Sequence, residues 1–346
     1  MENKTIENAS QEQNNQNLQN NTIEEKITKF LERKFRRSSS FKTILGYKMA
    51  INNFRKFLHK KYNLDIIQLL EEVNTKQRDP IDVMDEYYTF LTKCPNKTGK
   101  IGLGKSTIAS YISVAKQFLN GEGCKIYQED IKNRFTLPTS STGYEEGLSR
   151  QIINRVLRLS NAKLAAVILM TCSGGFRIGE IVQLRLSDID FTTYPTKIVI
   201  RKETAKTRQT RITHISSEAT TALKDFIAKY VRVNEENGRE RYIFLNHHDE
   251  RIADLKNRIE RRKSKNKPTV HLQKLLDRFE LELKVLGPEE RYARDVSVAV
   301  QNFQNQLVRV IDKIPDLNVK NDNQRNSIHF HAFRKFFKTQ VTDAHQ

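Results

Sequence analysis

The period of the hydrophobic pattern is the feature that most restricts how this 346-residue chain can fold. Apolar residues recur at the spacing of an α-helix through most of the sequence. The period changes to the alternation of a β-strand only in two short runs rich in β-branched residues, 197–203 and 210–216, which a basic turn divides. The pattern therefore predicts a mostly α protein with a small antiparallel β-sheet built around a hairpin.

The length of the chain allows two compact domains, because one domain usually takes about 100 to 200 residues. Residues 1–21 are almost wholly polar, and we expect a disordered tail there. A helical domain is predicted over 22–138, with helices near 64–73, 80–92 and 105–120 among its elements. Residues 139–144, rich in Ser, Thr and Gly, are predicted to be a linker. A mixed α/β domain would then occupy 145–346 and contain a charged helical insertion at about 250–314.

The balance of charges favours nucleic acid as a partner. Lys and Arg total 60 against 41 Asp and Glu, which gives a formal net charge of +19. Cations on a protein displace the counterions of DNA or RNA, so strongly basic domains often bind nucleic acid. The alternative is a basic surface that only faces solvent, as in an organism whose proteins are generally rich in lysine.

The sequence argues against disulfide-rich, metal-binding, secreted, membrane-spanning and nucleotide-binding proteins. Its three cysteines, Cys94, Cys124 and Cys172, are odd in number and widely spaced, which argues against a disulfide framework or a cysteine zinc site. We find no signal-peptide stretch, no run of 18 apolar residues, no nucleotide-binding glycine loop and no metal-ligand spacing. We therefore expect a soluble cytoplasmic protein that uses no cofactor and no metal.

Three short motifs could carry chemistry. In the segment 174–180, two glycines precede Arg177 at the expected start of a helix over 178–186, where an anion is favoured. The hairpin turn contains Lys202, Lys206 and Arg208, and a lysine there could donate a proton. His331 and Arg334, three positions apart, would share one helical face. Each motif alone has an ordinary explanation, such as a surface arginine, a solvated turn or a structural His–Arg pair.

Taken in order, the three motifs resemble the tyrosine recombinase (phage integrase) family. The segment 173–190 resembles the family's first conserved box, with Arg177 after a glycine pair, Glu180 three residues later and an Asp-Ile-Asp ending. The basic hairpin follows where the family keeps its lysine, and 331–337 resembles the start of the second box. Helices expected around 43–57 and 105–119 resemble the family's core-binding domain. The resemblance covers about 23–230 and 327–346.

This resemblance implies DNA breaking and rejoining through a covalent 3′-phosphotyrosyl link without a metal. Arg177 and Arg334 would hold the non-bridging phosphate oxygens, Lys206 (or Lys202) would protonate the departing 5′-oxygen, and His331 would assist proton transfer. Glu180 would support the arginine helix. The family acts on double-stranded DNA as a homotetramer on paired sites. The DNA-binding candidates are Arg36, Arg37, Lys42, Lys48, Lys105, Lys116 and Arg208.

The sequence departs from the family pattern in two places. No tyrosine follows Arg334 in the printed sequence, and the nearest upstream one, Tyr292, matches no family motif. We expect a fragment that ends before the nucleophile; the alternatives are an inactive DNA-binding relic or regulator, or a tyrosine from another subunit. The long interval between Lys206 and His331 indicates the insertion at about 250–314. That segment is either a solvated helical pair, a DNA or subunit contact, or a linker like that of a type IB topoisomerase.

Overall fold

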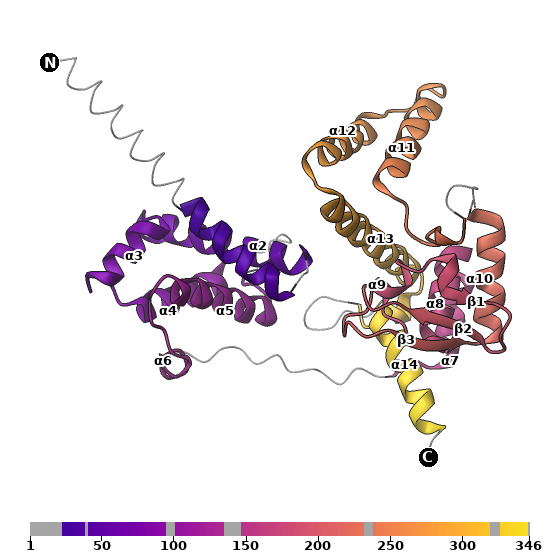
Figure 1. Ribbon diagram of the computed structural model, residues 1–346, viewed down its shortest axis with the longest axis horizontal. Coiled ribbons are helices and arrows are strands. Elements are labelled where there is room, and N and C mark those ends of the chain that lie inside the picture. Colours follow the sequence, from indigo (N-terminus) through magenta and orange to yellow (C-terminus); the bar gives the residue numbers. More distant parts are fainter. Residues whose placement is uncertain are drawn as a thin grey trace. The chain divides into compact units, whose positions relative to one another are not determined.

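The computed structural model describes residues 23–38, 41–94, 101–134, 147–231, 238–318 and 326–344. The chain divides into two compact units, residues 1–143 and 144–346 (Figure 1). The predicted tail at 1–21 and the predicted linker at 139–144 lie outside the described residues.

The described part of the first unit is helical. Its helices cover 23–38, α2 (Phe41–Tyr62), α3 (Ile66–Asn74), α4 (Pro80–Lys93), α5 (Lys105–Gly121) and α6 (Gln128–Arg134). Local signals begin two of them, because Asp65 forms a capping box at α3 and Asp79 caps α4. The centre is aromatic: Phe54, Phe57 and Tyr87 are fully buried, and the Tyr87 ring lies 4.9 Å from that of Phe54.

In its described residues, the second unit combines helices with three strands. Its longer helices are α7 (Arg150–Arg158), α8 (Ala162–Gly174), α10 (Ser217–Tyr230), α11 (His248–Lys263), α12 (Val270–Val285), α13 (Pro288–Ile311) and α14 (Phe330–Asp343). Its short helices are α9 (Ile178–Ile181), η1 (Leu186–Asp188), η2 (Gly238–Glu240) and η3 (Pro315–Leu317). Its strands are β1 (Ile189–Asp190), β2 (Thr196–Ile200) and β3 (Arg211–Ile215).

The strands form one antiparallel sheet in the order β1-β2-β3. Ile198 of β2 pairs with Ile189 on one side and with Thr213 on the other. Alternate residues of β2 are buried, as expected for a strand with one face on the core. The prediction of a mostly helical protein with a small antiparallel sheet is confirmed.

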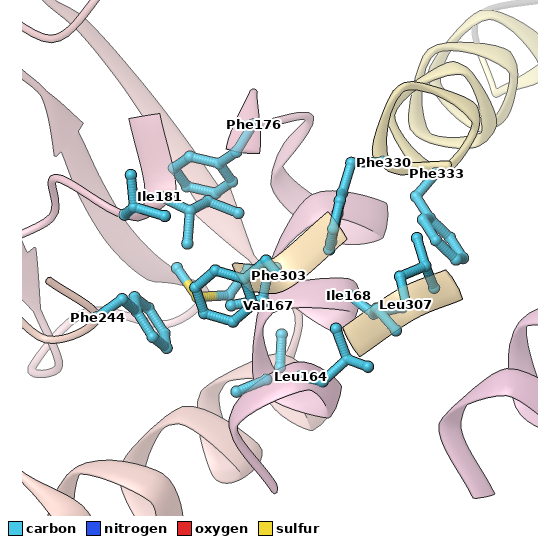
Figure 2. Close-up of a cluster of buried hydrophobic side chains, with 14 of the residues drawn as sticks. Leu164, Val167, Ile168, Phe176, Ile181, Phe244, Phe303, Leu307, Phe330 and Phe333 are labelled. Carbon is cyan, nitrogen blue, oxygen red and sulfur yellow. The ribbon is translucent and has the colours of Figure 1, made fainter. Parts of the chain in front are cut away.

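Helix α8 is the centre of the second unit's core. Leu164, Val167 and Ile168 on α8 are buried and pack with side chains from α13 and α14 (Figure 2). Phe303 of α13 contacts Phe330 of α14 edge to face, with ring centroids 6.4 Å apart. Since α8 ends at the glycine pair and α14 contains the His-x-x-Arg motif, this core determines where the two motifs meet.

The helix that follows Arg177 is shorter than predicted. We expected it to run to Leu186, but α9 ends at Ile181. Beyond it the backbone pairs with a distant segment, because Ile243 N donates to the Leu184 carbonyl at 3.0 Å and Leu186 N donates to the Arg241 carbonyl at 3.1 Å. These tertiary hydrogen bonds replace the helical ones that the local pattern favoured.

The segment expected to be an insertion is helical but divides between two cores. Helices α11 and α12 lie side by side (Figure 1) and share a small cluster that includes Ile252, Leu272 and Phe279. The end of α13 belongs instead to the main core, where Phe303 and Leu307 are each 2% exposed. The part of this segment that packs on itself therefore ends before α13 enters the main core, and the bounds of an insertion at about 250–314 stay a prediction.

Candidate active site: an arginine cluster around Glu180

The buried carboxylate of Glu180 lies at the centre of three arginines. Arg177 donates to it through its backbone N at 2.8 Å and through Nη1 at 2.9 Å. Arg211 donates two parallel hydrogen bonds, at 2.9 and 2.7 Å. Arg334 Nη1 lies 4.0 Å from Glu180 Oε2. The Glu180 side chain is only 2% exposed, whereas the guanidinium groups retain partial exposure.

The glycine pair brings Arg177 and Arg334 together. Gly175 ends α8 in a left-handed conformation with φ of 64°, which glycine adopts without strain. A Cβ added at Gly175 would lie 2.4 Å from the ring of Phe337, so this side chain of α14 packs directly on the bare backbone. Arg334 stands almost one helical turn before Phe337. The close approach of α14 therefore places Arg334 beside the start of α9.

Arg334 keeps hydrogen-bonding capacity unused. Its Nη1 is buried and has no hydrogen-bond partner among the described residues. Burial and the charge of Arg177 lower the pKa of Arg334, while Glu180 acts in the opposite direction. Three guanidinium groups against one carboxylate leave two formal positive charges in excess. Such a cluster favours an anion with several oxygens, such as a phosphodiester.

Glu180 remains ionised inside this cluster. Burial raises the pKa of its carboxyl, but hydrogen bonds from Arg211 and Arg177 outweigh burial and lower the pKa below its ordinary value of 4.5. The carboxylate orients Arg177 and Arg211, whose side chains are 36% and 30% exposed. Glu180 therefore acts as a positioning residue for these two arginines.

Arg211 is a member of the site that the motifs did not reveal. It begins β3, and on a strand it shares a face with Thr213 and Ile215. Thr213 Oγ1 donates to the Gly174 carbonyl at 2.8 Å, so this face of β3 lies against the end of α8. Strand alternation from the buried Ile215 could have placed Arg211 inward, but the sequence does not indicate the carboxylate that it meets.

The candidates for proton transfer have exposed side chains. Lys202, Lys206 and Arg208 lie exposed in the turn between β2 and β3, and Arg208 has φ of 55°. His331 is exposed in the first turn of α14. Among the described residues, neither Lys202 nor Lys206 shares a hydrogen bond or an ion-pair partner with the arginines around Glu180. Their roles remain predictions.

Tyr292 is held by other residues. Its hydroxyl donates to Gln183 Oε1 at 3.0 Å and lies 3.3 Å from the Tyr242 hydroxyl. Burial, together with the hydrogen bond to Tyr242, raises the pKa of Tyr292. A half-buried phenol that connects α13 to the segment after α9 has the contacts of a structural residue.

The DNA-binding candidates of the first unit belong to three helices. Those on 23–38, on α2 and at the start of α5 are exposed: Arg36, Arg37, Lys42, Lys48 and Lys105. Lys116, further along α5, is half-buried and donates to Gln128 Oε1 at 2.7 Å. Helices α2 and α5 pack against each other. Within the described ranges, no helix is long and apolar enough to cross a membrane.

One comparison with known proteins concerns part of the second unit. The model of the Phage integrase family matches residues 148–285, which contain Arg177, Glu180, the hairpin and Arg211. This part of the chain is therefore similar to the phage integrase, or tyrosine recombinase, family. No curated protein matches the sequence.

Solved structures extend the comparison to the fold. A lambda integrase dimer bound to a COC′ core site has 12% identity and a TM-score of 0.52, with 93% of this chain and 72% of that chain covered. An XerA recombinase has 17% identity and a TM-score of 0.35, over 93% and 85% of the two chains. The Tn1549 transposon integrase in complex with circular intermediate DNA has 13% identity and a TM-score of 0.44, over 85% and 87%. The lambda integrase match shows an integrase-like fold.

Proposed function

We propose that this chain is a site-specific DNA recombinase or integrase that breaks and rejoins duplex DNA through a phosphotyrosyl intermediate. The observation that carries the proposal is the convergence of Arg177 and Arg334 on one buried carboxylate, with Arg334 Nη1 left without a partner. Two arginines with free donor capacity can hold both non-bridging oxygens of a phosphodiester.

In the proposed reaction, a tyrosine oxygen attacks the scissile phosphorus and the bond to the 5′-oxygen breaks. Negative charge on the non-bridging oxygens grows in the pentacovalent transition state, and Arg177 and Arg334 stabilise it. Lys206 gives a proton to the departing 5′-oxygen, with Lys202 as the alternative donor. His331 assists transfer of the tyrosine proton. Glu180 and Arg211 hold Arg177 in position and do not touch the reacting atoms.

The proposed partner is double-stranded DNA, bound by both units. The exposed cations of α2 and α5 would contact phosphates, and Arg208 would do so from the hairpin turn. Recombination between two sites needs four strands to be cut, so we propose a homotetramer on paired DNA.

The test is covalent capture on a suicide DNA substrate that contains the candidate site, followed by a denaturing gel. Any natural version of the chain that has a tyrosine after Arg334 is tested beside it, because the proposed attack needs that nucleophile. We expect an adduct that Arg177→Ala and Arg334→Ala each reduce at least about a hundredfold, as for the loss of a transition-state donor. Arg158→Ala, an exposed arginine on α7, is the matched control.

A DNA substrate with a modified leaving group tests whether Lys206 protonates the departing 5′-oxygen. With sulfur in place of the bridging 5′-oxygen, departure needs no proton, because a thiol is far more acidic than an alcohol. This substrate should restore cleavage to Lys206→Ala but not to Arg177→Ala. Rescue of Lys202→Ala instead would move the role to Lys202. Binding without any adduct would indicate an inactive DNA-binding relative, and relaxation of supercoiled DNA without site preference would indicate a topoisomerase.

A further inference from the structure

A second cationic site lies in a cavity lined by α8, α11, α12, α13 and residues near Phe244. The cavity volume is about 490 Å³, within the range of about 300 to 1,000 Å³ that is usual for small-molecule pockets. None of the four residues of the Glu180 cluster lines it. It is therefore a separate feature of the second unit.

Positive charge exceeds negative charge around this cavity. Six cations line it: Lys163, Arg251, Arg258, Arg278, Arg294 and Arg309. Two lining carboxylates, Asp254 and Asp295, pair with Arg258 and Arg251. Glu282 pairs with Arg278 and Arg294. Six cations against these three carboxylates leave three positive charges in excess, which favours an anionic ligand.

Among the described residues, Lys163 is a half-buried lining cation without a carboxylate partner. Its ammonium donates to the Phe244 carbonyl at 3.3 Å and lies 5.3 Å from the Phe303 ring centroid. No carboxylate among the described residues forms an ion pair with it, and burial lowers its pKa. It also stands in the first turn of α8, where the helix dipole disfavours a cation. Two unfavourable effects at one lysine are offset if an anion binds beside it.

Arg251, which also lines the cavity, has an unused donor as well. Its Nη1 donates to Asp295 Oδ1 at 2.5 Å, and its guanidinium lies 4.2 Å from the centre of the Phe279 ring. Its Nη2 is buried without a hydrogen-bond partner among the described residues. A buried guanidinium nitrogen without a partner is costly, so a ligand oxygen there would stabilise the site.

The remaining wall is aromatic and aliphatic with a few amides. Phe244, Leu255, Leu275 and Phe303 supply the apolar surface, and Asn302 supplies a side-chain amide. We propose that this cavity binds a phosphorylated small molecule with an aromatic body, of the nucleotide class. Its phosphate groups would contact Lys163 and Arg251, and its ring would pack on the apolar wall.

The test is calorimetric titration of the full chain, without DNA, with ATP, adenosine and tripolyphosphate at fixed ionic strength. We expect one ATP per chain, bound at least about tenfold more tightly than either fragment. Lys163→Met should weaken ATP binding about tenfold or more. Lys274→Met, which removes an equal charge from an exposed position on α12, should leave it unchanged. Because no DNA is present, the result is independent of the recombinase proposal.

Folding of the variant is checked by thermal unfolding. Methionine has a similar length and removes an uncompensated charge, so Lys163→Met is expected to fold. Arg309→Gln, at an exposed lining position, provides a second variant that should also weaken ATP binding. Tripolyphosphate binding as tightly as ATP, or equal weakening by Lys163→Met and Lys274→Met, would mean adventitious binding of an anion to a basic surface and would overturn the proposal.

Discussion

At the residue scale, Glu180 decides the geometry of the arginine cluster. A carboxylate that is 2% exposed loses most of its hydration, and the hydrogen bonds from Arg177 and Arg211 replace it. Without that carboxylate, two guanidinium groups would repel each other and lose the acceptor that orients them. Its role is therefore to hold the cations of the proposed phosphate site close together.

We predict that Glu180→Gln destabilises the second unit by about 2 to 4 kcal/mol, since removing one partner of a buried ion pair leaves uncompensated charge. Because the arginines are partly exposed to solvent, the loss of unfolding free energy should be smaller than for a fully buried ion pair. Urea unfolding measures it, with Glu218→Gln on the exposed start of α10 as the control. An unchanged unfolding midpoint would show that the carboxylate does not stabilise the cluster.

The same carboxylate predicts a dependence on pH. Its pKa in the folded protein is below the ordinary value of 4.5, so the stability that it contributes is fully present above about pH 4.5. That contribution is lost as pH falls through the folded pKa. The difference in unfolding free energy between the wild type and Glu180→Gln should therefore be constant from about pH 7 to about pH 5 and shrink below pH 4.5. A difference that grows on acidification would contradict this assignment.

At the element scale, the end of α8 and the start of α14 form the two halves of the site. Gly175 lets the chain leave α8 in a left-handed turn and leaves room for Phe337. Thr213 of β3 donates a hydrogen bond to the Gly174 carbonyl in the same turn. The packing of α14 and β3 against the end of α8 therefore depends on the two glycines.

Gly175→Ala should displace α14 and separate Arg334 from Arg177. Positive φ costs alanine about 1 kcal/mol, and the contact with Phe337 adds the cost of moving the ring. We expect a loss of stability of about 2 kcal/mol or more and a marked fall in DNA cleavage. Gly179→Ala is the matched control, because nothing lies within 4 Å of a Cβ there. Equal effects of the two substitutions would refute the packing argument.

Helix α13 connects the α11–α12 pair to the main core, and this predicts two different responses to truncation. Phe303→Ala should destabilise the whole second unit by about 3 to 5 kcal/mol. Leu272→Ala, in the cluster of α11 and α12, should loosen only that pair. Hydrogen exchange measured peptide by peptide distinguishes the two responses. If Leu272→Ala also reduces the protection of amides in α8, helices α11 and α12 belong to the main core.

At the scale of the whole molecule, we expect the excess of cations to govern association with the proposed DNA partner. Exposed cations occur on helices of the first unit and in the hairpin turn of the second. The logarithm of the association constant should fall linearly with the logarithm of salt concentration, by about 0.9 per neutralised phosphate. Replacing both Lys42 and Lys48 with Gln should reduce this slope by about 2, measured by fluorescence anisotropy. A slope that does not change would remove α2 from the DNA-binding surface.

Local features of the sequence account for the helical class, the hairpin and the motifs around Arg177 and Arg334. Those features depend on local periodicity, on caps and on residues of fixed chemistry, all of which can be read along the chain. The sequence does not predict where Lys202 and Lys206 lie relative to the arginines. A turn has no regular period from which the direction of its side chains can be inferred.

Tertiary structure alone decided the rest. Arg211 entered the site because β3 packs against the end of α8, and α9 stopped early because the following backbone hydrogen-bonds with residues 241–243. Helix α13 joined the main core although its sequence continues a charged helical segment. Each outcome depends on contacts between residues far apart in the chain, whose energies exceed the local preferences that a sequence pattern reports.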